Sequence, residues 1–336
     1  MTSTQHPASS IRHPASIFPL ALLIMLVSIL TALVAHALDY HPLQKGKVEF
    51  ADSPPEDAGV MRTAVTCEQV LLAERLYRDR LLDIPEVVFL DNDRVKTFAL
   101  VYLPPGWDDL PATRRKAIVT LHGHCGHIGQ NFGLWQELGA RNGMAVIGLQ
   151  WWIDSNLPPK GYTIFYENGA PSGYHLDCRL DVYPFIDALL GRYRVESAML
   201  HGFSMAASSC LMVTYRDKLR KNRIDLGVFN AGHISASHPF RREIKRAARA
   251  RPDTPPFSDE NFIFFYDSDL QLNDTHEFVS EFGGNVLKVV TGNERHGAFF
   301  SPKYQELRRE IVEQYDALAD TAIRERRAAV TAHAGE

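Results

Sequence analysis

Six short apolar runs recur between residues 116 and 291 of this 336-residue chain. The stretches that separate them are long enough to hold helices. Strands that are apolar on both faces are typical of a parallel sheet covered by helices on its two sides. The runs are Lys116–Leu121, Met144–Trp151, Ser197–His201, Asp225–Asn230, Asn261–Asp267 and Asn285–Thr291. The pattern therefore predicts an α/β domain with a mostly parallel sheet.

The segments on either side of these runs set the expected domain boundaries. Two β-rich runs, Glu86–Leu90 and Val95–Leu103, flank Asp91-Asn92-Asp93 and predict a hairpin. Residues 303–328 have a charged helical pattern that closes the chain. We expect a tether and a helix over residues 38–85, the helix within Cys67–Asp83, and an α/β domain over residues 86–330.

The N-terminus has the pattern of an export signal. Arg12 is the only charged residue before an apolar run from Ile17 to about Val34, and small residues at Ala35 and Ala37 suit cleavage after Ala37. The alternative is an uncleaved anchor, because residues 17–38 are enough to cross a bilayer of about 30 Å. Residues 1–37 are thus expected to be a signal peptide or a membrane anchor, and the rest to be periplasmic or secreted.

Composition narrows the function classes. The 45% hydrophobic and 23% charged residues are ordinary globular usage, and the net charge of -4 gives no general attraction to nucleic acid. A basic run, Arg241–Arg251, predicts a helix with a solvated face, with contact to anionic lipid head groups as the sharper alternative. Export would allow disulfides, but the pairing of the four cysteines is open; they are Cys67, Cys125, Cys178 and Cys210.

The segment Gly202-Phe203-Ser204-Met205-Ala206 carries the strongest motif. It follows an apolar run and leads into a helical pattern, which fits the G-x-S-x-G turn that projects a serine hydroxyl above a sheet. Ala206 replaces the last glycine and adds a methyl group where the backbones must approach closely. A serine that only caps the helix is the simpler alternative. Ser204 is the candidate nucleophile.

A serine nucleophile needs a base and an orienting carboxylate, and later segments offer both in order. His296 lies in a glycine-bounded loop after the last apolar run and is the expected base. Asp267 is the last residue of the Asn261–Asp267 run, and Asp269 follows two residues later. We expect Asp269 to be the acid, because it lies beyond the strand end, and keep Asp267 as the alternative.

The glycine-rich segment Leu121–Gly129 suits an oxyanion hole because its backbone N–H groups are free to face a cleft. The expected donors are the N–H groups of His124 and Met205. The same segment holds potential metal ligands, but their spacing does not match the usual zinc patterns; these residues are His122, His124, Cys125 and His127. We therefore expect no metal and no organic cofactor.

An aromatic stretch follows the strand predicted over residues 144–151. Together with His122, its residues Trp151, Trp152 and Tyr166 are the expected substrate-binding residues. The alternative is that these aromatic side chains pack in the core under a long loop.

These motifs resemble the α/β-hydrolase superfamily, and within it exported esterases similar to polyhydroxybutyrate depolymerases and feruloyl esterases. The resemblance covers about residues 95–302 and rests on Leu121-His122-Gly123, Gly202-Phe203-Ser204, the acid and Arg295-His296-Gly297, in that order. It implies an α/β-hydrolase fold and ester hydrolysis through an acyl-enzyme. Ser204 would attack, His296 would take and return the proton, and Asp269 would orient the imidazole.

The sequence thus predicts an exported serine hydrolase that cleaves small or polymeric carboxylic esters, with no nucleic-acid partner. Association with a membrane through residues 17–38 remains open. The first alternative is a prolyl-oligopeptidase-like peptidase, although only about 80 residues precede the sheet. The second is a binding protein that keeps the fold without the chemistry, because fold alone does not confer activity.

Overall fold

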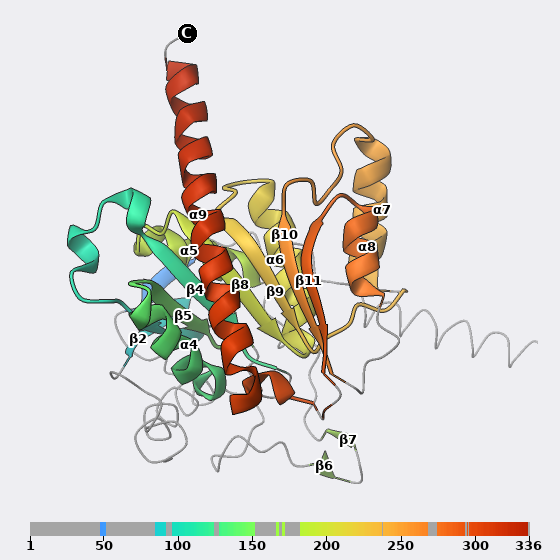
Figure 1. The fold of residues 1–336 in the computed structure, drawn as a ribbon, viewed down its shortest axis with the longest axis horizontal. Helices are drawn as coiled ribbons and strands as arrows, with labels where there is room; N and C mark the ends of the chain where they lie inside the picture. The colour runs from blue at the N-terminus through green and yellow to red at the C-terminus, as the bar shows by residue number, and fades with distance from the viewer. Residues whose placement is uncertain are drawn as a thin grey trace, which may run out of the picture. The chain divides into compact units, whose positions relative to one another are not determined.

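A nine-stranded sheet organises the part of the chain that the computed structural model describes (Figure 1). The described residues are 48–51, 85–91, 96–123, 128–151, 166–167, 170–171, 182–236, 238–267, 274–292, 294 and 296–334. All of them belong to one compact unit, Pro42–Glu336. The strand order is β1-β2-β3-β5-β4-β8-β9-β10-β11.

The strands, in chain order, are β1 (Glu49–Ala51), β2 (Glu86–Asp91), β3 (Lys96–Tyr102), β4 (Lys116–Leu121), β5 (Ala145–Leu149), β8 (Ser197–Phe203), β9 (Ile224–Asn230), β10 (Asn261–Tyr266) and β11 (Asn285–Thr291). From β5 to β11 all neighbours are parallel, whereas β1, β2, β3 and the β3–β5 pair are antiparallel. The six predicted strands and the predicted hairpin are confirmed. A separate two-stranded ribbon joins β6 (Tyr166–Glu167) to β7 (Ala170–Pro171).

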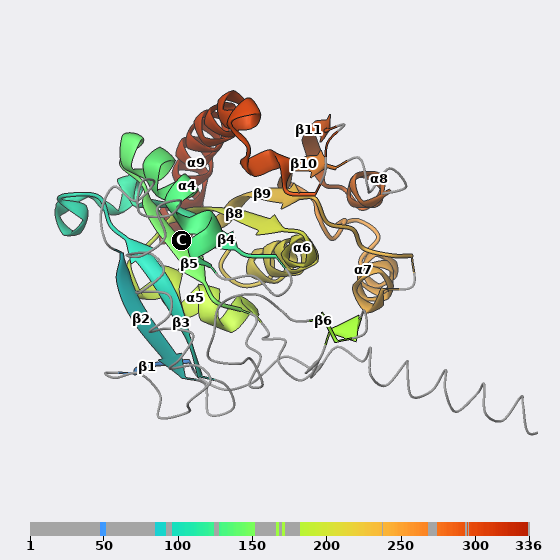
Figure 2. The same ribbon diagram turned by 90° about the horizontal axis from the view of Figure 1, so that it is seen from below.

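Helices cover the sheet on both faces, as Figures 1 and 2 show. The main helices are α4 (Gly129–Arg141), α5 (Val182–Arg192), α6 (Met205–Lys218), α7 (Pro239–Ala250), α8 (Thr275–Glu281) and α9 (Gln305–Ala334). Single 3₁₀ turns stand at Trp107–Asp109, Ala112–Arg114, Ala298–Phe300 and Pro302–Tyr304. The mostly parallel, doubly covered sheet that the sequence predicts is confirmed.

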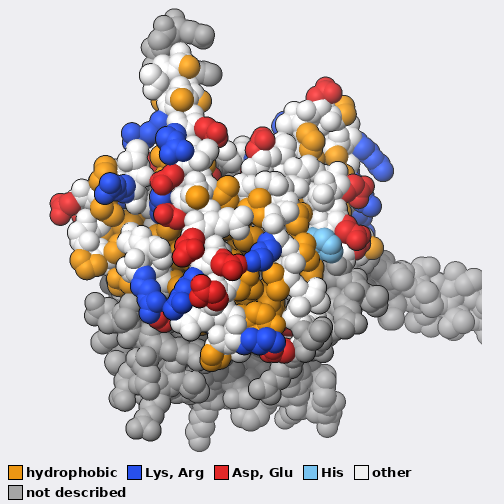
Figure 3. Space-filling model, in the orientation of Figure 1, with side chains coloured by type: hydrophobic (Ala, Val, Ile, Leu, Met, Phe, Trp, Pro, Cys, Tyr) orange, Lys and Arg blue, Asp and Glu red, His pale blue; other side chains and the backbone are white. Residues whose placement is uncertain are grey.

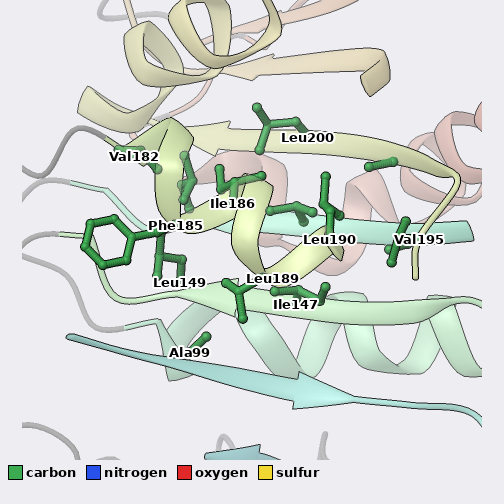
Figure 4. Close-up of a cluster of buried hydrophobic side chains, with 14 of the residues drawn as sticks. Ala99, Ile147, Leu149, Val182, Phe185, Ile186, Leu189, Leu190, Val195 and Leu200 are labelled. Atoms are coloured by element: carbon green, nitrogen blue, oxygen red, sulfur yellow. The ribbon is translucent and has the colours of Figure 1, made fainter. Parts of the chain in front are cut away.

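Two hydrophobic clusters fill the two sides of the sheet. On one side α5 and α6 pack against strand residues such as Val119 and Leu200, and Figure 4 shows α5 side chains meeting those of β3, β5 and β8. On the other side α4 and α9 pack against residues such as Ile118 and Met199. Residues 118 and 119 thus serve opposite faces, because successive strand side chains alternate. Every residue of β4 is buried, and four of its six residues are apolar, as expected of a strand covered on both faces.

The long C-terminal helix α9 is tied to the amino ends of the central strands by charged groups. Arg326 pairs with the buried carboxylate of Asp225, and that carboxylate also accepts a hydrogen bond from the Ser197 hydroxyl at 2.5 Å. Lys116 at the start of β4 lies 2.6 Å from both Asp316 and Asp320. These contacts fix the end of the sheet opposite to the candidate site.

The basic run forms α7 as predicted, and most of its cations face solvent. Arg241 is the exception, because it is buried and pairs with Asp274. Figure 3 shows acidic and basic side chains interspersed on the face of the molecule that it draws. The exposed cations of α7 therefore form a solvated helix face.

Several sequence predictions fall on residues outside the described part. These are the signal or anchor of residues 1–37, the helix within residues 67–83, and Cys67, Cys125 and Cys178. Among the described residues, no helix is both long enough and apolar enough to span a membrane. Cys210 is a free, buried thiol, and burial raises its pKa to about 12.

Candidate active site

Ser204 lies on a strained turn between β8 and α6. Its backbone has φ 55° and ψ -119°, a positive φ that non-glycine residues rarely adopt and that costs about 1–3 kcal/mol. Its N–H donates to the carbonyl of Asn230 at the end of β9, at 2.7 Å. The turn is thus held by the neighbouring strand, and the serine stands beyond the carboxyl end of the sheet.

Small residues let this turn form. A Cβ on Gly202 would overlap the Ala206 carbonyl and lie 2.9 Å from the Cβ of Cys210. A Cβ on Gly232 would overlap the Ser204 carbonyl and the Cβ of Ala207. The methyl of Ala206 itself is fully buried in the hydrophobic cluster of that sheet face. The departure from G-x-S-x-G is therefore accommodated, since the close approach depends on Gly202.

Three side chains from three loops form a continuous hydrogen-bonded chain. The Ser204 Oγ lies 3.0 Å from Nε2 of His296, and Nδ1 of His296 lies 2.8 Å from Oδ2 of Asp267. Asp267 directly follows β10, and His296 lies in the loop after β11. Because the carboxyl ends of parallel strands share one edge of a sheet, these loops meet there.

The acid contact corrects the sequence prediction. Asp267, the alternative in the sequence argument, makes the contact with His296, whereas Asp269, the expected acid, lies outside the described residues. The reason is the strand end: β10 stops at Tyr266, so Asp267 is already the first residue of the loop. Its side chain can therefore turn along the sheet edge toward the histidine.

The acid and the histidine differ in solvent access. The Asp267 side chain is fully buried, while 46% of the His296 side chain is exposed. Asp267 Oδ2 also accepts from the N–H of Gly297 at 3.2 Å, and among the described residues no partner contacts Oδ1. Gly297 takes a left-handed φ of 88°, so the loop turns tightly enough for this second bond. The carboxylate is thus fixed and the imidazole stays accessible.

A polar cluster that sequence reasoning missed lies beneath the serine turn. His201 of β8 is fully buried; Nδ1 lies 3.0 Å from the Thr120 hydroxyl and accepts from the Trp135 indole at 3.3 Å. Its Nε2 lies 3.1 Å from Nδ2 of the Asn230 amide. The only sequence signal was a lone histidine in an apolar strand.

Burial and the nearby Arg308 lower the pKa of His201 to about 3. The ring is therefore neutral at physiological pH and acts as a rigid polar support under the serine turn. In the unfolded chain the same group protonates near pH 6.5. The unfolded state thus binds more protons between pH 3 and 6.5, and stability rises with pH through this window.

The remaining predicted site residues divide into described and undescribed ones. Met205 is the first residue of α6, so the helix leaves its N–H free to face the site. His122 and Trp151 are buried, and the Trp151 indole donates to the His122 carbonyl at 2.7 Å. Trp151 thus lies in the core, as the packing alternative predicts. His124 and Trp152 lie outside the described residues, as does the side chain of Tyr166, whose backbone belongs to β6.

The metal alternative finds no support in the described part of the chain. No group of three or more histidine, cysteine or acidic side chains is placed there to hold a metal ion. Of the tract considered from sequence, only His122 is described, and its Nδ1 lies 2.7 Å from the Gly123 carbonyl. His124, Cys125 and His127 lie outside the described residues.

A serine on a strained strand-to-helix turn at the carboxyl edge of a mostly parallel sheet is the arrangement of α/β hydrolases. The described chain has the α/β-hydrolase fold. No protein-family model matches the sequence. No curated protein matches it significantly.

Solved structures with a similar fold share little sequence with this chain. A fungal esterase from Rhizomucor miehei is 14% identical, covering 81% of this chain and 100% of its own, with a TM-score of 0.48. A thermophilic esterase from the planctomycete Thermogutta terrifontis is 15% identical, covering 71% and 93%, with a TM-score of 0.48. A soluble variant of monoglyceride lipase from Saccharomyces cerevisiae is 12% identical, covering 70% and 95%, with a TM-score of 0.46. The function is therefore proposed from the residues of the site.

Proposed function

We propose that this protein is a serine hydrolase that cleaves carboxylic esters through an acyl-enzyme. The observation that carries the proposal is the chain of two hydrogen bonds from Ser204 through His296 to Asp267, built on a strained serine turn. A helix cap needs no histidine beside it, so the capping alternative leaves this geometry unexplained. A nucleophile with an adjacent base and an orienting acid is the arrangement that acyl transfer requires.

Each residue then has a defined role. His296 Nε2 takes the proton of the Ser204 hydroxyl as Oγ attacks the ester carbonyl, and later gives it to the leaving alcohol. Asp267 keeps the proton of the imidazole on Nδ1 and stabilises the imidazolium that forms. Water then attacks the acyl-enzyme with His296 as base, which releases the acid and restores Ser204.

The developing oxyanion needs hydrogen-bond donors. The Met205 N–H at the start of α6 is one proposed donor, and the positive end of the α6 dipole adds to it. The second proposed donor is the N–H of His124. Removing one such donor typically lowers the rate by about 10²- to 10³-fold.

The binding-protein alternative rested on Ala206 as a mark of relaxed geometry. The Ala206 methyl is buried in the core, and the serine turn, the base and the acid are in contact. These observations favour an enzyme. We propose further that the substrates are like those of polyhydroxybutyrate depolymerases or feruloyl esterases, and that the chain is exported. A panel of hydroxybutyrate oligomers, feruloyl esters and short acyl esters tests the first, and N-terminal sequencing of the mature protein tests the second.

A fluorophosphonate probe tests the mechanism directly, because it modifies only an activated serine. We expect one adduct at Ser204, located by peptide mass spectrometry, and its loss in Ser204→Ala and His296→Ala. Ser208→Ala is the matched control. Ser208 lies in the first turn of α6, which begins directly after Ser204, and its hydroxyl donates to the Met205 carbonyl at 2.7 Å. Labelling should persist in that variant. A folded wild-type protein that takes up no probe would refute the proposed function.

A further inference from the structure

Phe203, the residue between the glycine and the serine of the turn, lies flat against the imidazole of His296. The ring centroids are 4.9 Å apart, and the ring planes meet at 25°. The hydrogen bonds of His296 to Ser204 and Asp267 run in the plane of the imidazole, at its two nitrogens. The aromatic contact is made on the ring face, which those bonds do not use.

This contact restrains a motion that the two hydrogen bonds leave open. Bonds at Nδ1 and Nε2 define a line through the imidazole, and the ring can still rock about that line. Rocking tilts the nitrogen lone pair away from the Ser204 hydroxyl, because a hydrogen bond weakens as its angle closes. A flat neighbour against one face limits the tilt. This restraint matters more because nearly half of the His296 side chain is exposed.

Phe203 is itself fixed from other sides. The edge of the Phe300 ring meets it at 81° with the centroids 4.8 Å apart. The loop backbone at Gly123 packs so closely that an added Cβ would lie 2.8 Å from Cδ1 of Phe203. Phe300 in turn stands edge-on to the buried His201, with centroids 5.9 Å apart. The Phe203 ring is thus a rigid platform built on the core.

The face of an aromatic ring carries partial negative charge and attracts a cation. His296 becomes positively charged when it takes the proton of Ser204. We propose that Phe203 is a positioning residue for His296, which fixes the plane of the imidazole and stabilises its transient positive charge. The inference rests on the proposed hydrolase function and adds to the triad a residue that the motif leaves unspecified.

The kinetic test compares three variants on a short acyl ester. Phe203→Leu keeps an apolar side chain and removes the ring, and we expect kcat to fall about three- to tenfold, with KM unchanged within about twofold. Phe203→Tyr keeps the ring face and should keep kcat within about twofold of wild type. Phe282→Leu is the matched control, since this phenylalanine is also partly buried and contacts Phe278 away from the site. Its kcat should not change.

The second readout does not depend on turnover. In proton NMR, the Phe203 ring current should move the His296 Cε1 proton upfield, with the signal assigned by its loss in His296→Gln. Phe203→Leu should abolish this displacement, Phe203→Tyr should preserve it, and Phe282→Leu should leave it unchanged.

The outcomes separate the two proposals. Loss of kcat and of the ring-current shift in Phe203→Leu, both rescued in Phe203→Tyr, supports the positioning role. An unchanged kcat in Phe203→Leu, a loss confined to KM, or an equal loss in Phe203→Tyr overturns it. If the wild-type protein neither turns over esters nor takes up the probe, the proposed function fails, and the NMR shift decides whether Phe203 orients His296.

Discussion

Replacing Asp267 by asparagine keeps the shape of the side chain and removes its charge, so Asp267→Asn isolates the electrostatic part of the acid's role. The buried carboxylate of Asp267 accepts from His296 Nδ1 at 2.8 Å and from Gly297 N–H at 3.2 Å. An amide oxygen can still accept one of these bonds. It cannot balance the positive charge that His296 acquires during attack by Ser204.

The expected loss of kcat follows from the distance between Asp267 and His296 and from the exposed fraction of the His296 side chain. Opposite unit charges 2.8 Å apart attract by about 6 kcal/mol at an effective dielectric constant of about 20. Because 46% of the His296 side chain faces solvent, screening reduces this to about 3 kcal/mol as a lower bound. At about 1.36 kcal/mol per tenfold in rate, we expect kcat to fall by about 10²- to 10⁴-fold.

The assay is hydrolysis of a short chromogenic ester by wild type, Asp267→Asn and Asp269→Asn, with folding checked by circular dichroism. Asp269→Asn is the matched control, since it removes the same charge two residues further along the chain. It should keep kcat within about threefold of wild type. A larger loss in Asp269→Asn than in Asp267→Asn would refute the assignment of the acid.

Three further predictions concern the support of the site. Gly202→Ala should lower the free energy of unfolding by about 2–4 kcal/mol in urea titrations, because its Cβ would overlap the Ala206 carbonyl; an unchanged midpoint would contradict this packing. Ala206→Gly should keep kcat within about threefold and lower stability by about 1–2 kcal/mol, since it removes a buried methyl and adds a helical glycine; a large gain in kcat would show that the alanine impairs the turn. The lowered pKa of His201, about 3 against 6.5, means that stability is present above pH 6.5 and is lost as pH falls toward 3. Unfolding at pH 7 and pH 5 should therefore show about 2 kcal/mol more loss in wild type than in His201→Gln, and equal losses would refute a buried neutral imidazole.

The strands and the serine turn could be predicted from the sequence because each depends on residues that are adjacent in the chain. The β4 and β9 runs predict strands because short, largely apolar stretches are typical of a covered parallel sheet, and both strands are buried along their whole length. The β11 run is also a strand, although it lies at the edge of the sheet and none of its residues is buried. The turn at Ser204 was recognisable because the small residue at Gly202 and the following helical pattern are adjacent in the chain.

The contacts between site residues were harder to predict, because they join residues on different strands and helices that are far apart in the sequence. The choice between Asp267 and Asp269 depended on the residue at which β10 ends, and the hydrophobic pattern does not determine that residue. The support of His201 by Trp135 and Asn230, from α4 and β9, joins three separate elements. No spacing in the sequence encodes such a contact.

Hydrophobic periodicity and turn chemistry act between near neighbours in the chain. The amino-acid sequence was therefore enough to predict the class of sheet, the order of its strands along the chain, and the serine and histidine at its carboxyl edge. The folded structure was needed to show that Asp267 faces His296, that the Ala206 methyl is accommodated in the core, and that Phe203 stacks on the imidazole. Those outcomes depend on distances between strands far apart in the chain, and packing alone sets such distances.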